Sequence, residues 1–132
     1  MVKEREADGS LVYNQPAGHL GPNETLIEAV HRETLEETGW HVNAEAILSM
    51  NLYTSPRNNI TYFRCNFLAN AVELVADASL DAEIEDVLWM SEKELRDNQH
   101  QLRSPLVLQA ITDFQSGQRF PLSMIKNLLT ES

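Results

Sequence analysis

The stretch that decides the fold is GHLGPNETLIEAVHRETLEETGW, which occupies residues 18–40. Its first six residues are Gly, His, Leu, Gly, Pro and Asn, a composition typical of a loop. Apolar residues then recur at helical spacing, and Gly39 suits the left-handed residue that ends a helix. The pattern predicts a helix over residues 24–38, with Asn23 as its N-cap.

Negative charge is concentrated in this predicted helix. Residues 24–37 contain five Glu and one Arg, so they contribute −4 to the net charge of −10. Glu33, Glu36 and Glu37 fall on one helical face, because offsets of three and four residues return to the same side. Converging carboxylates suit Mg²⁺ or Mn²⁺, although an acidic helix face is more often simply solvated. The helix alone does not decide between a metal site and a solvated surface.

Length and composition restrict the classes of protein that fit. The chain has 132 residues, 42% of them hydrophobic and 23% charged, which is typical of one globular domain. A net charge of −10 disfavours binding to nucleic acid or to an anionic membrane surface. Cys65 is the only cysteine, so neither an intrachain disulfide nor a cysteine-based zinc site is expected. The charged N-terminus does not fit a signal peptide and no apolar run is long enough for a membrane span, so we expect a cytoplasmic protein.

The remaining sequence alternates strand and helix patterns. A hairpin is predicted over residues 2–13, two further strands over 46–53 and 60–68, a short helix after Ser91, and another helix that Ser104 caps. In the strand over 60–68, alternate residues predict one face in the core and the other lining a cleft. Together these patterns predict an α/β (α+β) fold in which helices flank a mixed sheet.

The charged residues also have a recognisable spacing. Gly18, Glu24, Arg32-Glu33, Glu36-Glu37 and Gly39 match all seven fixed positions of the signature box of the Nudix hydrolases, which this stretch resembles. Chance gives such a match with a probability of about 10⁻⁶ over the chain. Thr34 departs from the family pattern, which usually has a bulky aliphatic residue there. Residues 14–20, 102–107 and 115–122 extend the resemblance toward a bacterial phosphatase subgroup.

The resemblance implies a fold and an activity. The fold would be an α/β/α sandwich with a mixed sheet, in a single domain over residues 1–132 with the box at 18–40. That domain would be N-terminally short, because the family has an earlier strand that this sequence lacks. An unpaired strand edge invites pairing with a second chain, so we expect a monomer or a homodimer. The implied activity is hydrolysis of small-molecule organic pyrophosphates, with Mg²⁺ as cofactor and Mn²⁺ as an alternative.

The family's functional residues carry over by position. The resemblance implies that the metal is bound by Glu33, Glu36, Glu37, Glu83 and the backbone carbonyl of Ala17, with Asp81 and Glu85 as alternatives to Glu83. Either Glu37 or Glu36 would activate water. Arg32 and Glu24 would form an orienting pair.

Substrate-binding residues follow less directly, from hydrogen-bonding side chains that flank the inferred cleft. The candidates are Asn14, Gln15, Tyr53, Arg57, Tyr62 and Arg64. Nucleoside tri- and diphosphates and thiamine-type pyrophosphates are the expected substrates, with release of phosphate. The alternatives are an enzyme that cuts a nucleoside triphosphate or a substituted diphosphate to a monophosphate, a non-catalytic nucleotide sensor, and a structural acidic module.

Overall fold

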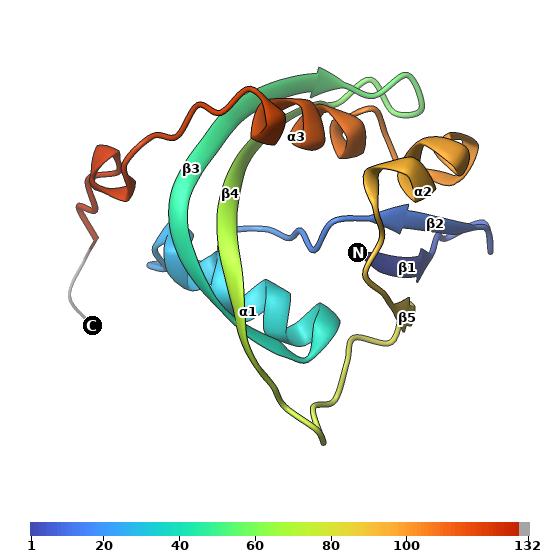
Figure 1. Cartoon of the computed structure of the whole chain (residues 1–132), viewed down its shortest axis with the longest axis horizontal. Coiled ribbons are helices and arrows are strands. Elements are labelled where there is room, and N and C mark those ends of the chain that lie inside the picture. The colour runs from blue at the N-terminus through green and yellow to red at the C-terminus, as the bar shows by residue number, and fades with distance from the viewer. Residues whose placement is uncertain (130–132) are drawn as a thin grey trace.

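The computed structural model describes residues 1–129, which form five strands, three α-helices and two 3₁₀ turns. In chain order these elements are β1 (Val2–Arg5), β2 (Leu11–Asn14), α1 (Leu26–Thr38), β3 (Trp40–Thr54), β4 (Thr61–Leu74), β5 (Ile84–Val87), α2 (Glu92–Asp97), η1 (Gln99–Gln101), α3 (Leu106–Gln115) and η2 (Leu122–Met124). Figure 1 shows β3 and β4 as one long arc, with α1 and α3 near its opposite ends. No helix in this described part of the chain is long and apolar enough to cross a membrane.

The strands form two separate sheets. One has the order β2-β1-β5 and the other pairs β3 with β4, and all of these pairs are antiparallel. The predicted α+β class is confirmed, and among residues 1–129 the parallel component of a mixed sheet is confined to one bridge between Tyr13 and Leu102. Among residues 1–129, no strand pairs with the edge of β4 that faces away from β3. The predicted pairing of an unpaired strand edge with a second copy of the chain stays a prediction.

Helix α1 begins two residues later than the predicted start at residue 24. Its N-cap is Thr25, whose side chain accepts a hydrogen bond from the Glu28 N–H while the Glu28 carboxylate accepts one from the Thr25 N–H. This reciprocal capping box satisfies two amides that a helix start leaves free. The predicted cap, Asn23, instead adopts a left-handed conformation with φ 57° in the preceding turn. Gly39 ends the helix with φ 77°, as predicted.

The core is formed by side chains from both sheets and from helices α2 and α3. The largest fully buried side chains are Val2 of β1, Ile47 of β3, Leu95 of α2 and Val107 of α3. Burying an aliphatic side chain of this size contributes roughly 1.5–3 kcal/mol, and these four side chains come from both sheets and from both C-terminal helices. Pro105 occupies the cap position of α3 that the sequence assigns to Ser104, whose hydroxyl still accepts a hydrogen bond from the Leu106 N–H.

The hairpin of β3 and β4 is longer and less buried than predicted. Phe63, which the alternating pattern places in the core, is 64% exposed and lies opposite Leu52, which is 73% exposed. Cys65 and Phe67 on the same strand are half-buried. The expected core face of this strand therefore holds only toward its middle, where α3 packs on β3.

Candidate active site

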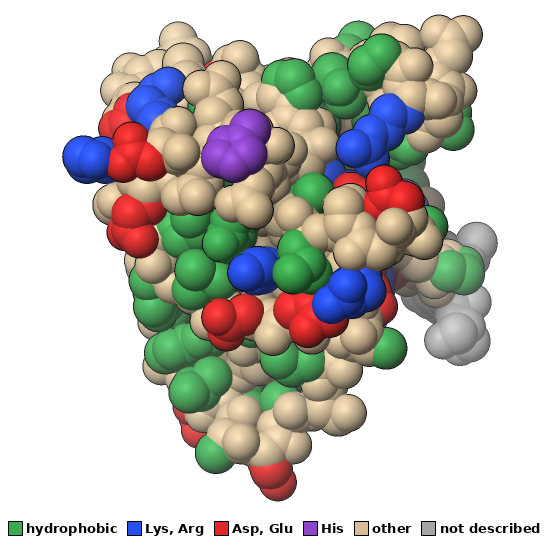
Figure 2. Space-filling view, turned by 90° about the vertical axis from the view of Figure 1, so that its right-hand side faces the viewer, with side chains coloured by type: hydrophobic (Ala, Val, Ile, Leu, Met, Phe, Trp, Pro, Cys, Tyr) green, Lys and Arg blue, Asp and Glu red, His purple; other side chains and the backbone are tan. Residues whose placement is uncertain are grey.

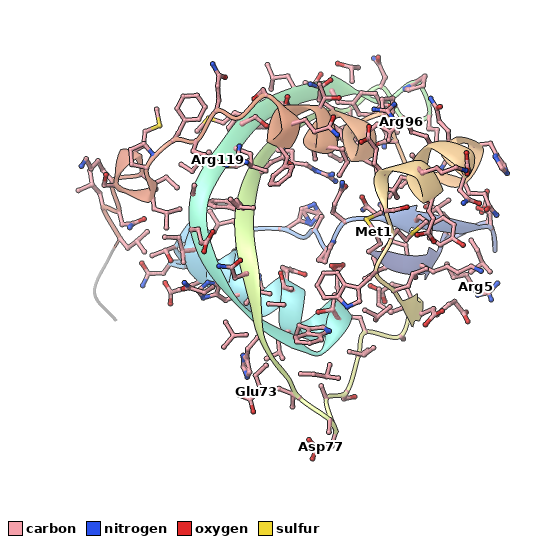
Figure 3. All side chains as sticks on the ribbon, in the orientation of Figure 1. Met1, Arg5, Glu73, Asp77, Arg96 and Arg119 are labelled. Atoms are coloured by element: carbon pink, nitrogen blue, oxygen red, sulfur yellow. The ribbon has the colours of Figure 1, made fainter. Side chains whose placement is uncertain are left out.

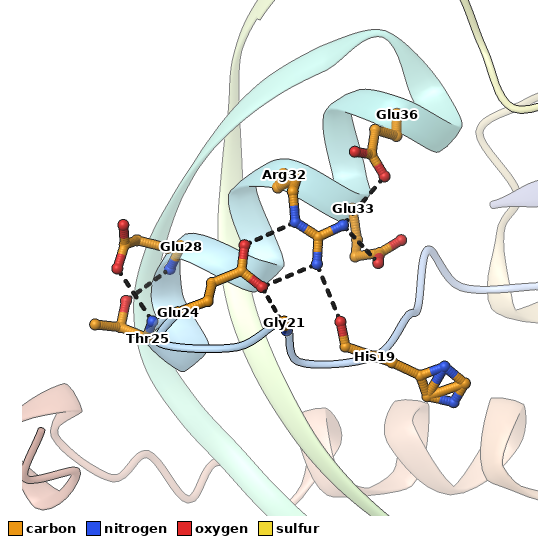
Figure 4. Close-up of polar contacts among 8 residues, drawn as sticks. All are labelled: His19, Gly21, Glu24, Thr25, Glu28, Arg32, Glu33 and Glu36. Carbon is orange, nitrogen blue, oxygen red and sulfur yellow. Dashed lines mark hydrogen bonds and ion pairs between the residues drawn. The ribbon is translucent and has the colours of Figure 1, made fainter. Parts of the chain in front are cut away.

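Arg32 lies among several carboxylates on and just before α1 and pairs with them (Figure 4). Its guanidinium donates to both carboxylate oxygens of Glu24, at 2.7 and 2.9 Å, and to Glu33 at 2.8 Å and Glu36 at 3.2 Å. Glu24 also accepts a hydrogen bond from the Gly21 N–H. The ion pair with Arg32 and this amide lower the pKa of Glu24 to about 2. Bidentate pairing to a guanidinium fixes orientation as well as charge, so Arg32 and Glu24 hold the loop against the helix.

The box begins with a glycine because the loop passes directly over a carboxylate. A Cβ added to Gly18 would lie 1.9 Å from Cδ of Glu33, a distance that no pair of non-bonded carbon atoms tolerates. Any side chain at residue 18 would therefore displace Glu33.

Three carboxylates converge beside this network. Oxygen atoms of Glu33, Glu36 and Asp81 all lie within 4.8 Å of one another. Asp81 reaches the helix because its backbone N–H donates to the carbonyl of Glu36 at 3.0 Å. Burial and the nearby charges of Glu83 and Glu36 raise the pKa of Asp81. Hard oxygen donors with mutual repulsion are the donor set that a divalent cation fits, and we call Glu33, Glu36 and Asp81 the acidic cluster.

Glu37 lies in a different environment. Glu37 is only 6% exposed, and one of its carboxylate oxygens accepts a hydrogen bond from the Ala17 N–H at 2.9 Å. Burial raises the pKa of Glu37 to about 8, and the charges of Glu4, Glu33 and Asp81 add to the rise. The contact with Ala17 is made by its amide, whereas the sequence assigns a role to its carbonyl.

A cleft of about 1500 Å³ runs past these groups, between the two sheets. On the face in Figure 2, basic and acidic side chains lie next to one another across the middle of the molecule. The orienting pair, Arg32 and Glu24, and the alternative ligand Glu85 do not line this cleft, but the other residues that the sequence nominates for metal or substrate do: Asn14, Gln15, Ala17, Glu33, Glu36, Glu37, Tyr53, Arg57, Tyr62, Arg64, Asp81 and Glu83. Of the acidic residues that the resemblance proposes for this position, Asp81 lies in the acidic cluster, whereas Glu83 lines the cleft outside it, and its role as a metal ligand stays a prediction.

Two buried oxygen atoms in the cleft lack a partner within the described residues. They are the side-chain carbonyls of Asn14 and Gln15. The amide of Gln15 donates to the Val107 carbonyl at 2.8 Å, and that of Asn14 approaches Glu4 at 3.4 Å. A buried acceptor without a donor is uncommon, so these two oxygens mark a position where a hydrogen-bond donor is missing.

Sequence reasoning assigned no role to Glu4 and Arg103, which also line this cleft. Glu4 is 6% exposed, and its carboxylate accepts a hydrogen bond from Arg103 at 2.7 Å. The two residues are 99 positions apart, so no spacing in the sequence signals the pair. The available signal was an acidic residue within a short predicted strand, because such a residue needs a partner for its charge if it is buried.

Comparisons with known proteins agree with this geometry. The model of the NUDIX domain family matches residues 1–110. The Phosphatase NudJ proteins of Escherichia coli K12 and of Shigella flexneri are each 37% identical over 125 residues, which span 95% of this chain and 80% of those proteins. Among solved structures, a NUDIX hydrolase from Nitrosomonas europaea matches with a TM-score of 0.93 and 38% identity, covering 96% of this chain and 85% of that one.

Proposed function

The chain belongs to the NUDIX domain family and is a Nudix hydrolase, and on that premise we propose that it is a magnesium-dependent phosphatase that releases orthophosphate from nucleoside tri- and diphosphates and from thiamine-type pyrophosphates. The observation that carries the proposal is the convergence of Glu33, Glu36 and Asp81 beside a cleft. The similarity to Phosphatase NudJ supports the choice of a phosphatase over other Nudix reactions.

The acidic cluster fits a divalent cation, and Glu33, Glu36 and Asp81 would hold it. Mg²⁺ favours six oxygen ligands and keeps several waters, so three carboxylates leave positions for water and for phosphate oxygens. When bound, the cation supplies charge neutralisation for the phosphates and lowers the pKa of bound water. Mn²⁺ suits the same oxygen donors.

Glu37 is our candidate general base. The hydrogen bond from the Ala17 N–H and the burial of the side chain fix its carboxyl group at the edge of the acidic cluster. A carboxylate that faces a water molecule there accepts its proton as the water attacks phosphorus, and such a base contributes about 10²–10⁴-fold to the rate. Glu36 belongs to the cluster and is salt-bridged to Arg32, which favours a role as ligand instead.

The organic part of the substrate would lie against the opposite side of the cleft. The free carbonyl oxygens of Asn14 and Gln15 would accept hydrogen bonds from its amino or hydroxyl groups. Tyr53 and Tyr62, which are cross-strand neighbours on β3 and β4, provide aromatic rings for contact with a heterocycle.

The test is to identify the product. Purified protein with Mg²⁺ is incubated with a nucleoside triphosphate, a nucleoside diphosphate and thiamine pyrophosphate, and phosphorus NMR follows the products. We expect orthophosphate as the released group. Release of pyrophosphate together with a nucleoside monophosphate would overturn the phosphatase assignment, and no hydrolysis of any of the three would overturn the proposed substrates.

A further inference from the structure

Two arginines from distant segments of the chain line the same cleft as the acidic cluster. Arg64 belongs to β4, where it lies opposite Asn51 of β3. Arg103 follows η1, and its backbone N–H donates to the carbonyl of Tyr13 at 2.9 Å, which places it beside β2. Burial and the positive charge of Arg103 both lower the pKa of Arg64, so the charges of the two arginines interact.

Arg64 is incompletely satisfied. Within residues 1–129, its side chain makes no hydrogen bond, and no carboxylate lies within 4.0 Å of its nitrogen atoms, although the residue is half-buried. Glu4 and Glu37 act on it only at longer range. A guanidinium carries five N–H donors and keeps its charge, so a position of this kind favours an anionic partner.

Arg103 is held in place by a carboxylate and still reaches the cleft. One of its terminal nitrogens donates to Glu4 at 2.7 Å, and its Nε lies 4.0 Å from Glu6. Its side chain remains 48% exposed, while that of Glu4 is 7% exposed. Glu4 is therefore a positioning residue that orients the guanidinium, and the remaining N–H groups stay available to a ligand.

From this placement we propose that Arg64 and Arg103 form an anion-binding site that receives a phosphate group of the substrate while a neighbouring phosphate group lies at the acidic cluster. This inference rests on the proposed function for the identity of the substrate. Two planar guanidinium groups offer paired N–H donors that match phosphate oxygens. An anion that binds between them is attracted to both and offsets the repulsion between the two positive charges. The site makes affinity depend on the length of the phosphate chain.

The probe for this site is inorganic triphosphate, titrated calorimetrically into the protein in EDTA so that no metal contributes. Arg64→Gln and Arg103→Gln are each expected to weaken binding by at least tenfold. Arg96→Gln is the matched control, because Arg96 is an exposed arginine on α2 that pairs with Glu92 and lies outside the cleft (Figure 3). The control is expected to bind within twofold of the wild type.

Arg64→Lys separates anion binding from a structural role. Lysine keeps the charge that balances Glu4 and Glu37 but loses the planar fork, so we expect an unchanged melting temperature and weaker triphosphate binding. Unchanged binding in Arg64→Gln and Arg103→Gln, an equal loss in Arg96→Gln, or no binding by the wild type would each overturn the proposal. If binding depends on both arginines but no pyrophosphate substrate is hydrolysed with Mg²⁺, the proposed function fails and the anion site stands. If hydrolysis occurs and KM is unaffected in both variants, the anion site fails and the proposed function stands.

Discussion

Two environments on the acidic face of α1 shift the pKa of a carboxyl group in opposite directions. Around the middle of the helix, Arg32 pairs with Glu24, Glu33 and Glu36, and the pKa of Glu24 falls to about 2. At the end of the helix, Glu37 is buried and accepts a hydrogen bond from the Ala17 N–H, and its pKa rises to about 8. A guanidinium stabilises the charged form of a carboxyl group, whereas burial beside other carboxylates disfavours it.

The difference separates two roles within one motif. The Arg32 pairs fix the loop and the orientation of Glu33 and Glu36 in the acidic cluster. The raised pKa of Glu37 supports our proposal that it exchanges a proton with water as a general base. Changes at Glu37 should therefore affect the rate most, and changes around Arg32 should affect the position and affinity of the metal ligands.

Replacing Glu37 should have the largest effect. Glu37→Gln keeps the size and an oxygen that accepts the Ala17 N–H but cannot accept a proton, so we expect kcat to fall by about 10³-fold with KM nearly unchanged. Steady-state kinetics at saturating Mg²⁺ measure this. Glu73→Gln is the control, because Glu73 lies at the far end of β4 (Figure 3) and should keep wild-type kinetics. Near wild-type turnover by Glu37→Gln would remove Glu37 from the chemistry.

Asp81 and Glu83 provide a matched pair for the metal site. Asp81 belongs to the acidic cluster and Glu83 does not, and the family resemblance names Glu83 as the metal ligand with Asp81 as an alternative. We expect Asp81→Asn to weaken Mg²⁺ binding by at least tenfold, and Glu83→Gln to change it by less than threefold. Calorimetric titration with Mg²⁺ distinguishes them, and the reverse order of effects would restore Glu83 as the ligand.

These two residues also show where sequence reasoning stops. The helix, its glycine stop and the pairing of Arg32 with Glu24 were predictable, because they depend on spacing within one segment. The place of Asp81 depends on how the chain between β4 and β5 returns to α1, where the Asp81 N–H bonds to the Glu36 carbonyl. The pairing of Glu4 with Arg103 likewise depends on tertiary folding. Long-range contacts of this kind leave no periodic signal in the sequence.

A methyl group added at residue 18 should displace Glu33, which pairs with Arg32 on the acidic face of α1. Gly18→Ala would place Cβ against the carboxylate of Glu33, so Glu33 must move away from the acidic cluster. We expect Mg²⁺ affinity to fall by about tenfold, with a stability loss of about 1–2 kcal/mol. Gly21→Ala is the milder control, since its Cβ would lie 3.2 Å from the Glu24 carboxylate. Equal Mg²⁺ affinities for the wild type and Gly18→Ala would show that Glu33 is not held by this contact.

The pH dependence of stability should show the smallest effect. The pKa of Glu37 is raised from its ordinary 4.5 to about 8. Between these values the folded state binds more protons than the unfolded state, so the stability from the protonated group is complete below pH 4.5 and is lost as pH rises toward 8. In EDTA, the melting temperature of Glu37→Gln minus that of the wild type should increase as pH rises from about 5 to about 8.5, because the wild type loses the stability of its protonated carboxyl group and the amide does not titrate. A constant difference would mean that Glu37 titrates normally.

The most direct test of the account follows orthophosphate release from a nucleoside triphosphate while Mg²⁺ is titrated into EDTA-treated protein. We expect a background rate without metal and a saturable rise of at least 10³-fold as the acidic cluster fills. The same titration of Asp81→Asn should saturate only at higher Mg²⁺. A rate that does not depend on Mg²⁺, or a titration curve unchanged in Asp81→Asn, would contradict the assignment of these carboxylates as the metal site of the enzyme.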